Sequence, residues 1–395
     1  MGSLLREAPA FRALWASRAV SQVGDGISRV ALVLLVAGDG PGAVGLVLLG
    51  GTLPRLLGPF AGALVDRTDS RLLLRACELT AGSCVLAVAL IRPPLPVLLL
   101  LVAVAAAAAT GTGTAGRSAL PALVRPERIG EATSWLGTAL NLQVLLGGAA
   151  GGALVVLVGV RGALLVDAGT FAVAVLLLGG LPRLPPSDRP SAGVLAETRA
   201  GLRYARIDPA VRALALGTLA LVAFLSLGNV ALVFLLRDSL NASDASLGAA
   251  QTVYGVGMLA GSLALVRFGR QSPVVWLLTG AALGAVGTVT VGLAPALLVV
   301  FAGQLLAGVG NALDVVASDT LVQRVVPRPM LGRVFGLVGT SAQLGAALAY
   351  ACGGPLLQAT SPRAVYLISG LGSLTALALL APALRQPGDT NNASR

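Results

Sequence analysis

Four ionisable residues lie inside long apolar runs of the sequence, namely Asp25, Arg29, Arg55 and Asp314. Charged groups at membrane depth are unfavourable unless they are paired or hydrated, so each is a candidate for function. Asp25 and Arg29 are four residues apart and share a face of a helix. The chemistry open to such a set is reversible proton binding by a carboxylate, with an arginine that tunes its affinity for the proton. We therefore take these four residues as candidates for proton coupling.

Two roles are open for Asp25. At a rise of 1.5 Å per residue it lies about 15 Å from the cytoplasmic end of its helix, and Arg55 has a similar depth on the next segment. In one role Asp25 accepts a proton and Arg29 or Arg55 tunes it; in the other, a permanent ion pair fixes the two helices together. For Asp314 the alternatives are a carboxylate that attracts a cationic substrate and an inner-gate contact.

Other polar residues in the apolar runs are weaker candidates. Asp167 is expected to be a solvated or gate residue, and Glu78 is expected to pair with Arg75 at the start of a helix. Uncharged polar side chains either line a cavity or form interhelical hydrogen bonds, which are worth about 1 kcal/mol or less. The cavity-lining candidates are Gln22, Asn141, Asn229, Gln251, Tyr254, Gln304, Asn311 and Gln343.

Several kinds of chemistry lack the residues they need. The chain has no His and no Lys, so it has no imidazole base or ligand and no phosphate-binding P-loop lysine. Its three cysteines, Cys77, Cys84 and Cys352, lie in apolar runs, which argues against a disulfide framework and a structural zinc site. We expect no catalytic residue, no metal and no cofactor, and thus a protein that is not an enzyme.

The composition indicates a multi-pass membrane protein. Of the 395 residues, 56% are hydrophobic and 11% are charged, whereas soluble domains carry about 25% charged residues. So few charges cannot cover a water-soluble surface, which also argues against a nucleic-acid binder despite the net charge of +11. The expected partners are the lipid bilayer and a small-molecule substrate.

About twelve apolar runs are long enough to cross a bilayer, which takes about 20 residues. A polar, proline-rich stretch divides them into two sets of six, so we expect an all-α fold of twelve transmembrane helices in two bundles. The predicted domains are a first bundle over 1–181, a cytoplasmic linker over 182–209, a second bundle over 210–385 and a tail over 386–395. The predicted spans are 15–37, 42–65, 72–91, 95–116, 133–158, 162–181, 210–236, 246–266, 273–293, 296–320, 332–357 and 363–384.

The arginines predict the orientation of these spans. With the N-terminus inside, 22 of the 28 cationic residues, all of them Arg, fall on the cytoplasmic side and four on the outer side. Positive charge collects in cytoplasmic loops, so both termini are expected in the cytoplasm. We expect the protein in the cell membrane.

The two halves of the sequence repeat each other. Five residues recur with identical type at a shift of 202 positions, and Asn141 matches Gln343 in kind. Duplicated halves around a central site are the usual architecture of secondary transporters. The recurring residues are Gly130, Gly137, Thr138, Gly151 and Gly152, which reappear as Gly332, Gly339, Thr340, Gly353 and Gly354.

Several segments resemble the major facilitator superfamily. GALVDRTDSR at 62–71 resembles its loop signature between the second and third helices. FRALWASRAVSQVGDGISRVALVLLV at 11–36 resembles the first helix of the drug:proton antiporter branch with macrolide-efflux and siderophore-exporter proteins. The segments LPALVRPERIGEATSWLGTALNL at 120–142 and LVQRVVPRPMLGRVFGL at 321–337 resemble further stretches of that branch.

The resemblance implies a monomeric carrier that exports hydrophobic or amphipathic molecules, drugs included, by alternating access and proton antiport. Alternatives are an exporter of a siderophore or endogenous metabolite, and an uptake carrier. The resemblance also implies a conformational switch, in which Asp66 caps the eleventh helix in one state and releases it in the other. This switch would comprise Gly62, Asp66, Arg67, Arg71, Gly332 and Arg333.

Two positions depart from the antiporter pattern. Gly148 stands where proline is typical, and the fourth predicted span lacks the buried arginine that many proton-driven antiporters carry. The second departure argues against the usual proton-coupling arrangement.

Overall fold

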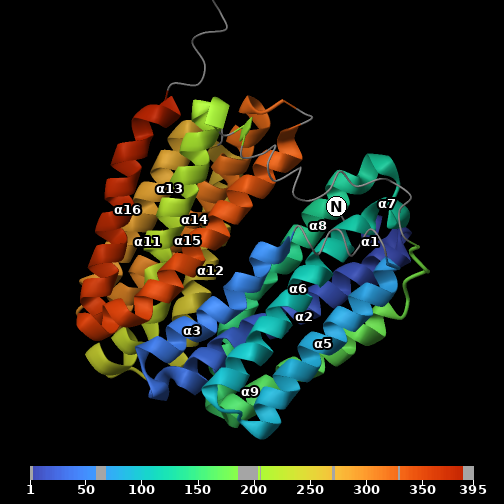
Figure 1. The fold of residues 1–395 in the computed structure, drawn as a ribbon, viewed down its shortest axis with the longest axis horizontal. Helices are drawn as coiled ribbons and strands as arrows, with labels where there is room; N and C mark the ends of the chain where they lie inside the picture. Colours follow the sequence, from blue (N-terminus) through green and yellow to red (C-terminus); the bar gives the residue numbers. More distant parts are fainter. Residues whose placement is uncertain are drawn as a thin grey trace, which may run out of the picture. The chain divides into compact units, whose positions relative to one another are not determined.

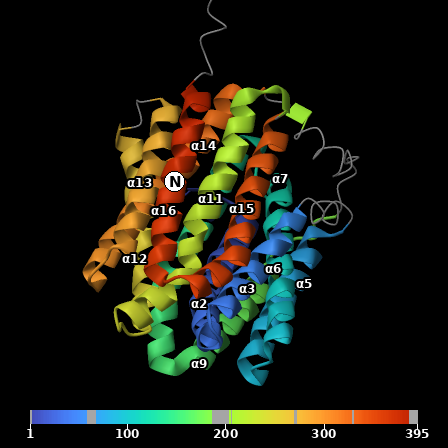
Figure 2. The ribbon, with the colours of Figure 1, turned by 60° about the vertical axis from the view of Figure 1, so that its left-hand side comes forward.

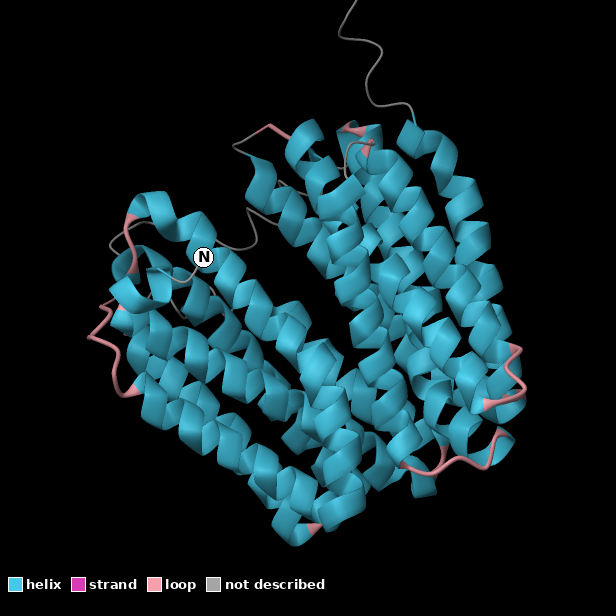
Figure 3. Ribbon diagram, turned by 180° about the vertical axis from the view of Figure 1, so that it is seen from behind, coloured by secondary structure: helices cyan, strands magenta, loops and turns pink. Residues whose placement is uncertain are grey.

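The computed structural model describes residues 3–58, 68–185, 203–204, 206–268, 272–327 and 330–385. Within these residues every regular element is helical and there is no strand, as Figure 3 shows. The all-α fold predicted from the apolar runs is therefore confirmed. The tail over 386–395, most of the linker and the end of the second predicted span lie outside the described residues.

The chain divides into two compact units. One consists of Met1–Val194 with Ser243–Thr252, and the other of Leu195–Ala242 with Val253–Arg395. Each unit has its own helix packing. The domain boundaries named above remain a prediction.

In the first unit, α2 and α5 pack against α9, while α6 packs against both α5 and α3 (Figure 1). Prolines open several helices: Pro9 stands at the start of α2 and Pro41 at the start of α3, where the missing N–H would have no partner in any case. The elements are α1 (Ser3–Glu7), α2 (Pro9–Val36), η1 (Ala37–Asp39), α3 (Pro41–Thr52), η2 (Leu53–Leu57), α5 (Ser70–Ile91), α6 (Leu95–Ser118), α7 (Leu120–Leu123), η3 (Pro126–Arg128), α8 (Ile129–Leu142), the π-helical turn η4 (Gln143–Gly147) and α9 (Gly148–Leu178).

Gly159 breaks the longest helical stretch of this unit. Its backbone has φ 74° and ψ 172°, a conformation that glycine adopts without the penalty of a Cβ. Helix α9 therefore consists of two helices that meet at Gly159. The predicted spans over 133–158 and 162–181 are separated at the same place.

In the second unit, α11 packs against α15 and α16, and α13 packs against α14 and α16. Figures 1 and 2 both show α11, α15 and α16 side by side. The elements are α11 (Pro209–Phe234), the π-helical turn η5 (Leu235–Ser239), α12 (Ala245–Phe268), α13 (Pro273–Gly292), α14 (Leu297–Val325), α15 (Leu331–Ala359) and α16 (Pro362–Arg385).

The internal repeat has a packing equivalent in the two units. A Cβ at Gly151 would lie 3.1 Å from Val30 Cβ on α2, the first long helix of its unit. A Cβ at Gly353 would lie 2.9 Å from Val230 Cγ2 on α11, the first long helix of the other unit. Two glycines related by the shift of 202 residues thus admit the same kind of close helix crossing.

Nine helices in the described residues are long and apolar enough to span a membrane. One of them, Pro126–Leu178, has 53 residues and extends over about twice the length that a bilayer requires. The segment Pro41–Leu56 is apolar but shorter. The chain is therefore a multi-pass membrane protein, and the number twelve stays a prediction.

Glycines bring α13 and α14 into backbone contact. A Cβ at Gly310 would meet the backbone of Gly284 and would lie 2.5 Å from the carbonyl oxygen of Gly280. A Cβ at Gly303 would lie 2.7 Å from the carbonyl oxygen of Gly287. Small residues at this spacing stabilise helix pairs in lipid, where van der Waals packing replaces the hydrophobic effect.

We predict that Gly310→Ala destabilises the protein, whereas Gly339→Ala does not. The first substitution forces α13 and α14 apart and is expected to cost about 1–3 kcal/mol. The second adds a Cβ where no atom lies within 4 Å, and alanine in a helix gains about 0.5–1 kcal/mol over glycine. Thermal unfolding midpoints in detergent measure both effects. Equal midpoints for the two variants would contradict the close crossing.

Candidate functional site

Asp25 lies in the middle of α2, and its side chain is half-buried. The positive charges that act on its carboxylate are those of Arg18, on the same helix, and Arg55, in η2. Arg29 is exposed. The arginine of α2 beside Asp25 is therefore Arg18, seven residues before it, and not Arg29 as the i, i+4 spacing suggested.

Glu78 reaches from α5 to α2. Its side chain is 2% exposed, and its Oε1 lies 3.5 Å from Arg18 Nη1. The Ser21 hydroxyl donates a hydrogen bond of 2.9 Å to its Oε2. The expected pairing of Glu78 with Arg75 is wrong, because Glu78 points into the bundle and pairs with the helix opposite.

Asp167 on α9 is fully buried. The Ser28 hydroxyl donates a hydrogen bond to its Oδ2, and the Thr170 hydroxyl donates one of 3.1 Å to its Oδ1. The carboxyl group fits beside α2 only because Gly24 has no side chain, since a Cβ there would overlap Asp167 and Thr170. Asp167 is thus an interior residue of the bundle and not a solvated one.

These contacts gather on one face of α2. Arg18, Ser21, Asp25 and Ser28 follow one another at intervals of three or four residues, which places them in one stripe along the helix. Apart from Gln22, the other buried residues of α2 are apolar or small. The stripe carries the polar partners of the two buried carboxyl groups, Glu78 and Asp167.

Asp314 lies on α14 in the second unit. Its Oδ1 is buried and has no hydrogen-bond partner among the residues that the structure describes. The backbone N of Asp314 would lie 2.6 Å from a Cβ at Gly280, so α14 crosses α13 closely beside this carboxyl group. Asp314 is therefore a partly buried acidic residue, with one buried oxygen that lacks hydroxyl partners such as those of Asp167.

The uncharged candidates differ in solvent exposure and are buried, partly buried or exposed. Gln22 and Gln304 are buried, whereas Asn141 is exposed. Asn229 donates a hydrogen bond of 3.1 Å from its Nδ2 to the Tyr350 hydroxyl, which ties α11 to α15. This contact favours a role for Asn229 in hydrogen bonding between helices, and not in lining a cavity. The remaining candidates are partly buried: Gln251, Tyr254, Asn311 and Gln343.

A steric constraint explains why position 148 is glycine and not the proline that is typical of antiporters. A Cβ at Gly148 would lie 2.7 Å from Gln251 Cβ, and Gln251 belongs to the part of α12 that groups with the first unit. A proline ring at position 148 would therefore collide with Gln251.

Three of the six predicted switch residues, Gly62, Asp66 and Arg67, lie outside the described residues. Arg71 is used within the first unit, where its Nη2 donates a hydrogen bond of 2.7 Å to the Gly179 carbonyl after α9. In the second unit, Arg333 Nη1 lies 3.3 Å from Met330 Sδ, and no atom lies within 4 Å of a Cβ at Gly332. The switch remains a prediction.

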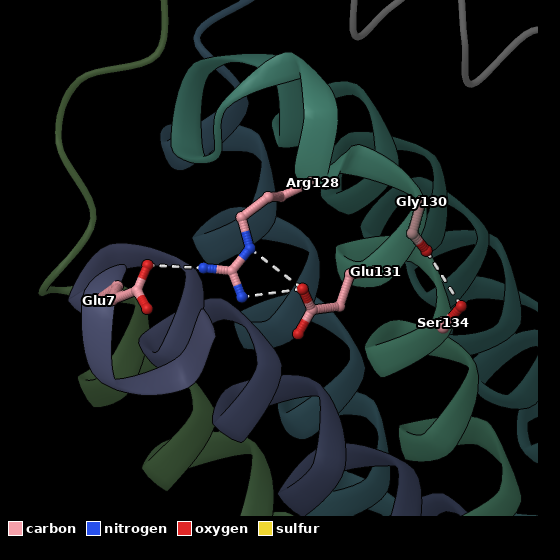
Figure 4. A network of polar contacts seen from close by, with 5 residues as sticks. All are labelled: Glu7, Arg128, Gly130, Glu131 and Ser134. Carbon is pink, nitrogen blue, oxygen red and sulfur yellow. Dashed lines mark hydrogen bonds and ion pairs between the residues drawn. The ribbon is translucent and has the colours of Figure 1, made fainter. Parts of the chain in front are cut away.

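A second charged cluster joins α1 to the start of α8. Figure 4 shows Arg128 between Glu7 and Glu131, with 2.6 Å from Nη1 to Glu7 Oε2 and 2.8 Å from Nη2 to Glu131 Oε2. The hydrogen bond to Glu131 raises the pKa of Arg128 above its ordinary value. This cluster is partly exposed, so it fastens two short elements together and differs in kind from the buried groups on α2.

Sequence reasoning underrated Glu78, Asp167 and Arg18. One signal of their role was present: in Gly24-Asp25-Gly26, glycines flank an acidic residue inside an apolar helix. Gly24 makes room for Asp167, and a Cβ at Gly26 would lie 2.6 Å from Gly147 Cα in η4. Glycines on either side of a buried charge thus marked the place where neighbouring helices approach.

The model of the Major Facilitator Superfamily matches residues 14–236 and 214–395 of the chain. The enterobactin exporter EntS of Escherichia coli O1:K1 / APEC is 28% identical over 385 residues, covering 94% of this chain and 91% of that protein. The uncharacterised MFS-type transporter YfiS of Bacillus subtilis (strain 168) is 26% identical over 392 residues, covering 93% and 91%.

Two solved structures share the fold. An auto-inhibited peptide transporter of the POT family has a TM-score of 0.78 at 14% identity and covers 98% of this chain and 99% of its own. A bacterial homologue of the human lysosomal transporter Spinster, in an inward-facing and unoccupied conformation, has a TM-score of 0.74 at 16% identity, with 95% and 97% covered.

We predict that Arg18→Ala lowers the free energy of unfolding by about 1–3 kcal/mol, because it leaves the buried carboxyl group of Glu78 without one of its hydrogen-bond partners. Replacing the carboxylate as well, in Arg18→Ala/Glu78→Gln, is expected to restore most of that loss. Thermal unfolding of both variants and of Glu78→Gln completes a double-mutant cycle.

Arg128→Met is the matched control for this cycle, since it removes a partly exposed arginine from its contacts with two glutamates. Its unfolding midpoint is expected to fall less than that of Arg18→Ala, and the difference from wild type is expected to vanish in high salt. Purely additive effects of the Arg18 and Glu78 substitutions would contradict the buried pair.

Proposed function

The chain belongs to the Major Facilitator Superfamily, and on that premise we propose that this transporter exports hydrophobic or amphipathic small molecules from the cell in exchange for protons. It would do so as a monomer in the cell membrane, with both termini in the cytoplasm. The observation that carries the proposal is the pair of carboxyl groups buried among apolar helices, Glu78 and Asp167, with the half-buried Asp25 between their serine partners on α2.

The proposed cargo rests on the composition of the helices. Their buried side chains are mostly leucine, valine and alanine, with few hydrogen-bonding groups. A transport path between helices of this composition would suit an apolar or amphipathic molecule better than a sugar, which requires many hydrogen-bond partners. Similarity to an exporter, EntS, supports outward transport.

Proton coupling requires a carboxyl group that can exchange its proton within the membrane. Asp25 is half-buried on α2, and the positive charges of Arg18 and Arg55 act on its carboxyl group. Asp314 has a buried oxygen without a partner, so the second unit offers a carboxyl group for a proton or for a cationic part of the cargo. We assign coupling to Asp25 first and to Asp314 second.

A second candidate function is export of a siderophore or an endogenous metabolite. The specific observation in its favour is the similarity to EntS over 94% of this chain. The two candidates differ in cargo and share one mechanism. An uptake carrier is a further alternative, which the direction of flux decides.

We predict that cells containing the protein expel ethidium or a macrolide, and that an uncoupler abolishes this efflux. Asp25→Asn is expected to reduce gradient-driven efflux by about tenfold or more, because an amide cannot release a proton; a tenfold loss corresponds to about 1.4 kcal/mol. Fluorescence of loaded cells measures the rate, and membrane insertion is checked by immunoblot.

Asp39→Asn is the matched control, since Asp39 is an exposed carboxylate in η1 just beyond the end of α2. Its efflux is expected to equal that of the wild type. Full efflux by Asp25→Asn would exclude Asp25 from coupling and leave Asp314→Asn as the variant to measure. Absence of efflux for every dye and macrolide would favour the siderophore or metabolite as cargo.

A further inference from the structure

Two buried carboxyl groups stand on either side of Asp25 along α2. Ser21 binds Glu78 and Ser28 binds Asp167, and the two serines are seven residues apart, or about 10 Å along the helix axis. Asp25 lies between them on the same face. The three acidic groups therefore follow one another through the interior of the first bundle.

Asp167 is surrounded by hydroxyl groups. Ser28 binds one oxygen of its carboxyl group and Thr170 binds the other. The charges that act on Asp167 are the negative ones of Asp25 and Glu78. An ionised carboxylate buried without a cation is unfavourable by several kcal/mol, and a serine or threonine hydroxyl can accept a hydrogen bond as well as donate one. The site therefore suits a carboxylic acid that keeps its proton.

Glu78 has a different environment, because one cation reaches it. Arg18 Nη1 lies 3.5 Å from Oε1, which is the long end of a hydrogen bond. The negative charge of Asp25 also acts on Glu78, and the Cys77 thiol is its neighbour on α5. Arg18 thus stands between two carboxyl groups, Glu78 and Asp25, and it can fully neutralise only one of them.

We propose that Glu78 and Asp167 are proton-binding residues of the first bundle, joined through Ser21, Asp25 and Ser28 of α2. This proposal rests on the proposed proton-driven export and names the residues that hold the protons. The positive charges of Arg18 and Arg55 act on Asp25, and Glu78 and Asp167 hold protons in its vicinity. The ligand named in this proposal is a proton.

Each transfer in this cluster moves one proton. The O–H bond of the Asp167 carboxylic acid breaks, the proton joins the Asp25 carboxylate, and the negative charge passes to Asp167. The reverse step restores the starting state. No oxidant or further reactant is needed, and the total charge of the cluster changes only when Asp25 exchanges its proton with water.

Gly24 gives Asp167 its place in the cluster. A Cβ at Gly24 would overlap the Asp167 and Thr170 side chains, so Gly24→Ala displaces the carboxyl group while leaving every acidic residue in the chain. Gly38 is the matched control near the end of the same run of helix, where a Cβ meets no atom within 4 Å.

Infrared spectroscopy of the purified protein tests the proposal without any substrate. Protonated carboxylic acids have a carbonyl stretching band of their own, and we expect part of it in the wild type to persist at neutral pH. Asp167→Asn and Glu78→Gln are each expected to remove a component of that band, whereas Asp39→Asn leaves it unchanged. A band that is the same in wild type and in either buried-residue variant would overturn the proposal.

A transport measurement then separates proton coupling from substrate binding. A difference of one pH unit can sustain about a tenfold accumulation per exchanged proton, and Asp167→Asn is expected to reduce that accumulation to about one. Exchange of labelled for unlabelled cargo at equal concentrations moves no net proton, so it is expected to continue at the wild-type rate. Loss of exchange together with accumulation would overturn the proposal, because it would make Asp167 a residue of cargo binding or of folding.

The measurements also distinguish a failure of the proposed export function from a failure of the proton-binding proposal. If the wild type carries neither dye, macrolide nor siderophore, the infrared measurement still shows whether Glu78 and Asp167 hold protons. Gly24→Ala adds an independent readout, since it is expected to shift the Asp167 component of the band in frequency, and Gly38→Ala is expected to leave it in place. An unshifted band in Gly24→Ala would overturn the assignment of that component to Asp167.

Discussion

A carboxyl group inside an apolar helical bundle must have hydrogen-bond partners, a cation or a proton, and the first unit is built around that constraint. One helix, α2, supplies the partners for two other helices: Ser21 and Arg18 meet Glu78 on α5, and Ser28 meets Asp167 on α9. The same contacts hold the three helices together. Interactions that stabilise the bundle are therefore the ones that a change of protonation at these carboxyl groups would alter, which links the fold to the proposed coupling.

Close packing is the second condition for this arrangement. Side chains as short as serine and aspartate can meet only where the helix backbones approach, and glycine permits that approach. Gly24 leaves room for Asp167, and Gly26 lies against Gly147 in η4. In the second unit the glycines of α13 and α14 achieve a similar crossing beside Asp314. Both units thus place a buried acid next to a glycine contact.

Much of the fold was predictable because two features can be read from neighbouring residues: the length of each apolar run, and the glycines and prolines that interrupt it. The break at Gly159 and the starts at Pro41 and Pro273 agree with the predicted spans to within a few residues. Pairing between distant residues was not predictable from a helical period. Glu78 is 60 positions from Arg18 and was expected to pair with nearby Arg75. For Asp25 the expected partners were Arg29 or Arg55; Arg55 acts on it, whereas Arg29 is exposed and the further cation, Arg18, was not expected. Which face of each helix is buried decides these pairs, and one sequence does not contain that information.

The most direct measurement is the number of protons released when cargo binds to the purified protein, read with an indicator dye in weakly buffered detergent solution. We predict that the wild type releases protons on binding and that Glu78→Gln/Asp167→Asn binds the same cargo with a smaller release. Binding by the wild type without any release of protons would contradict a coupling role for the buried carboxyl groups.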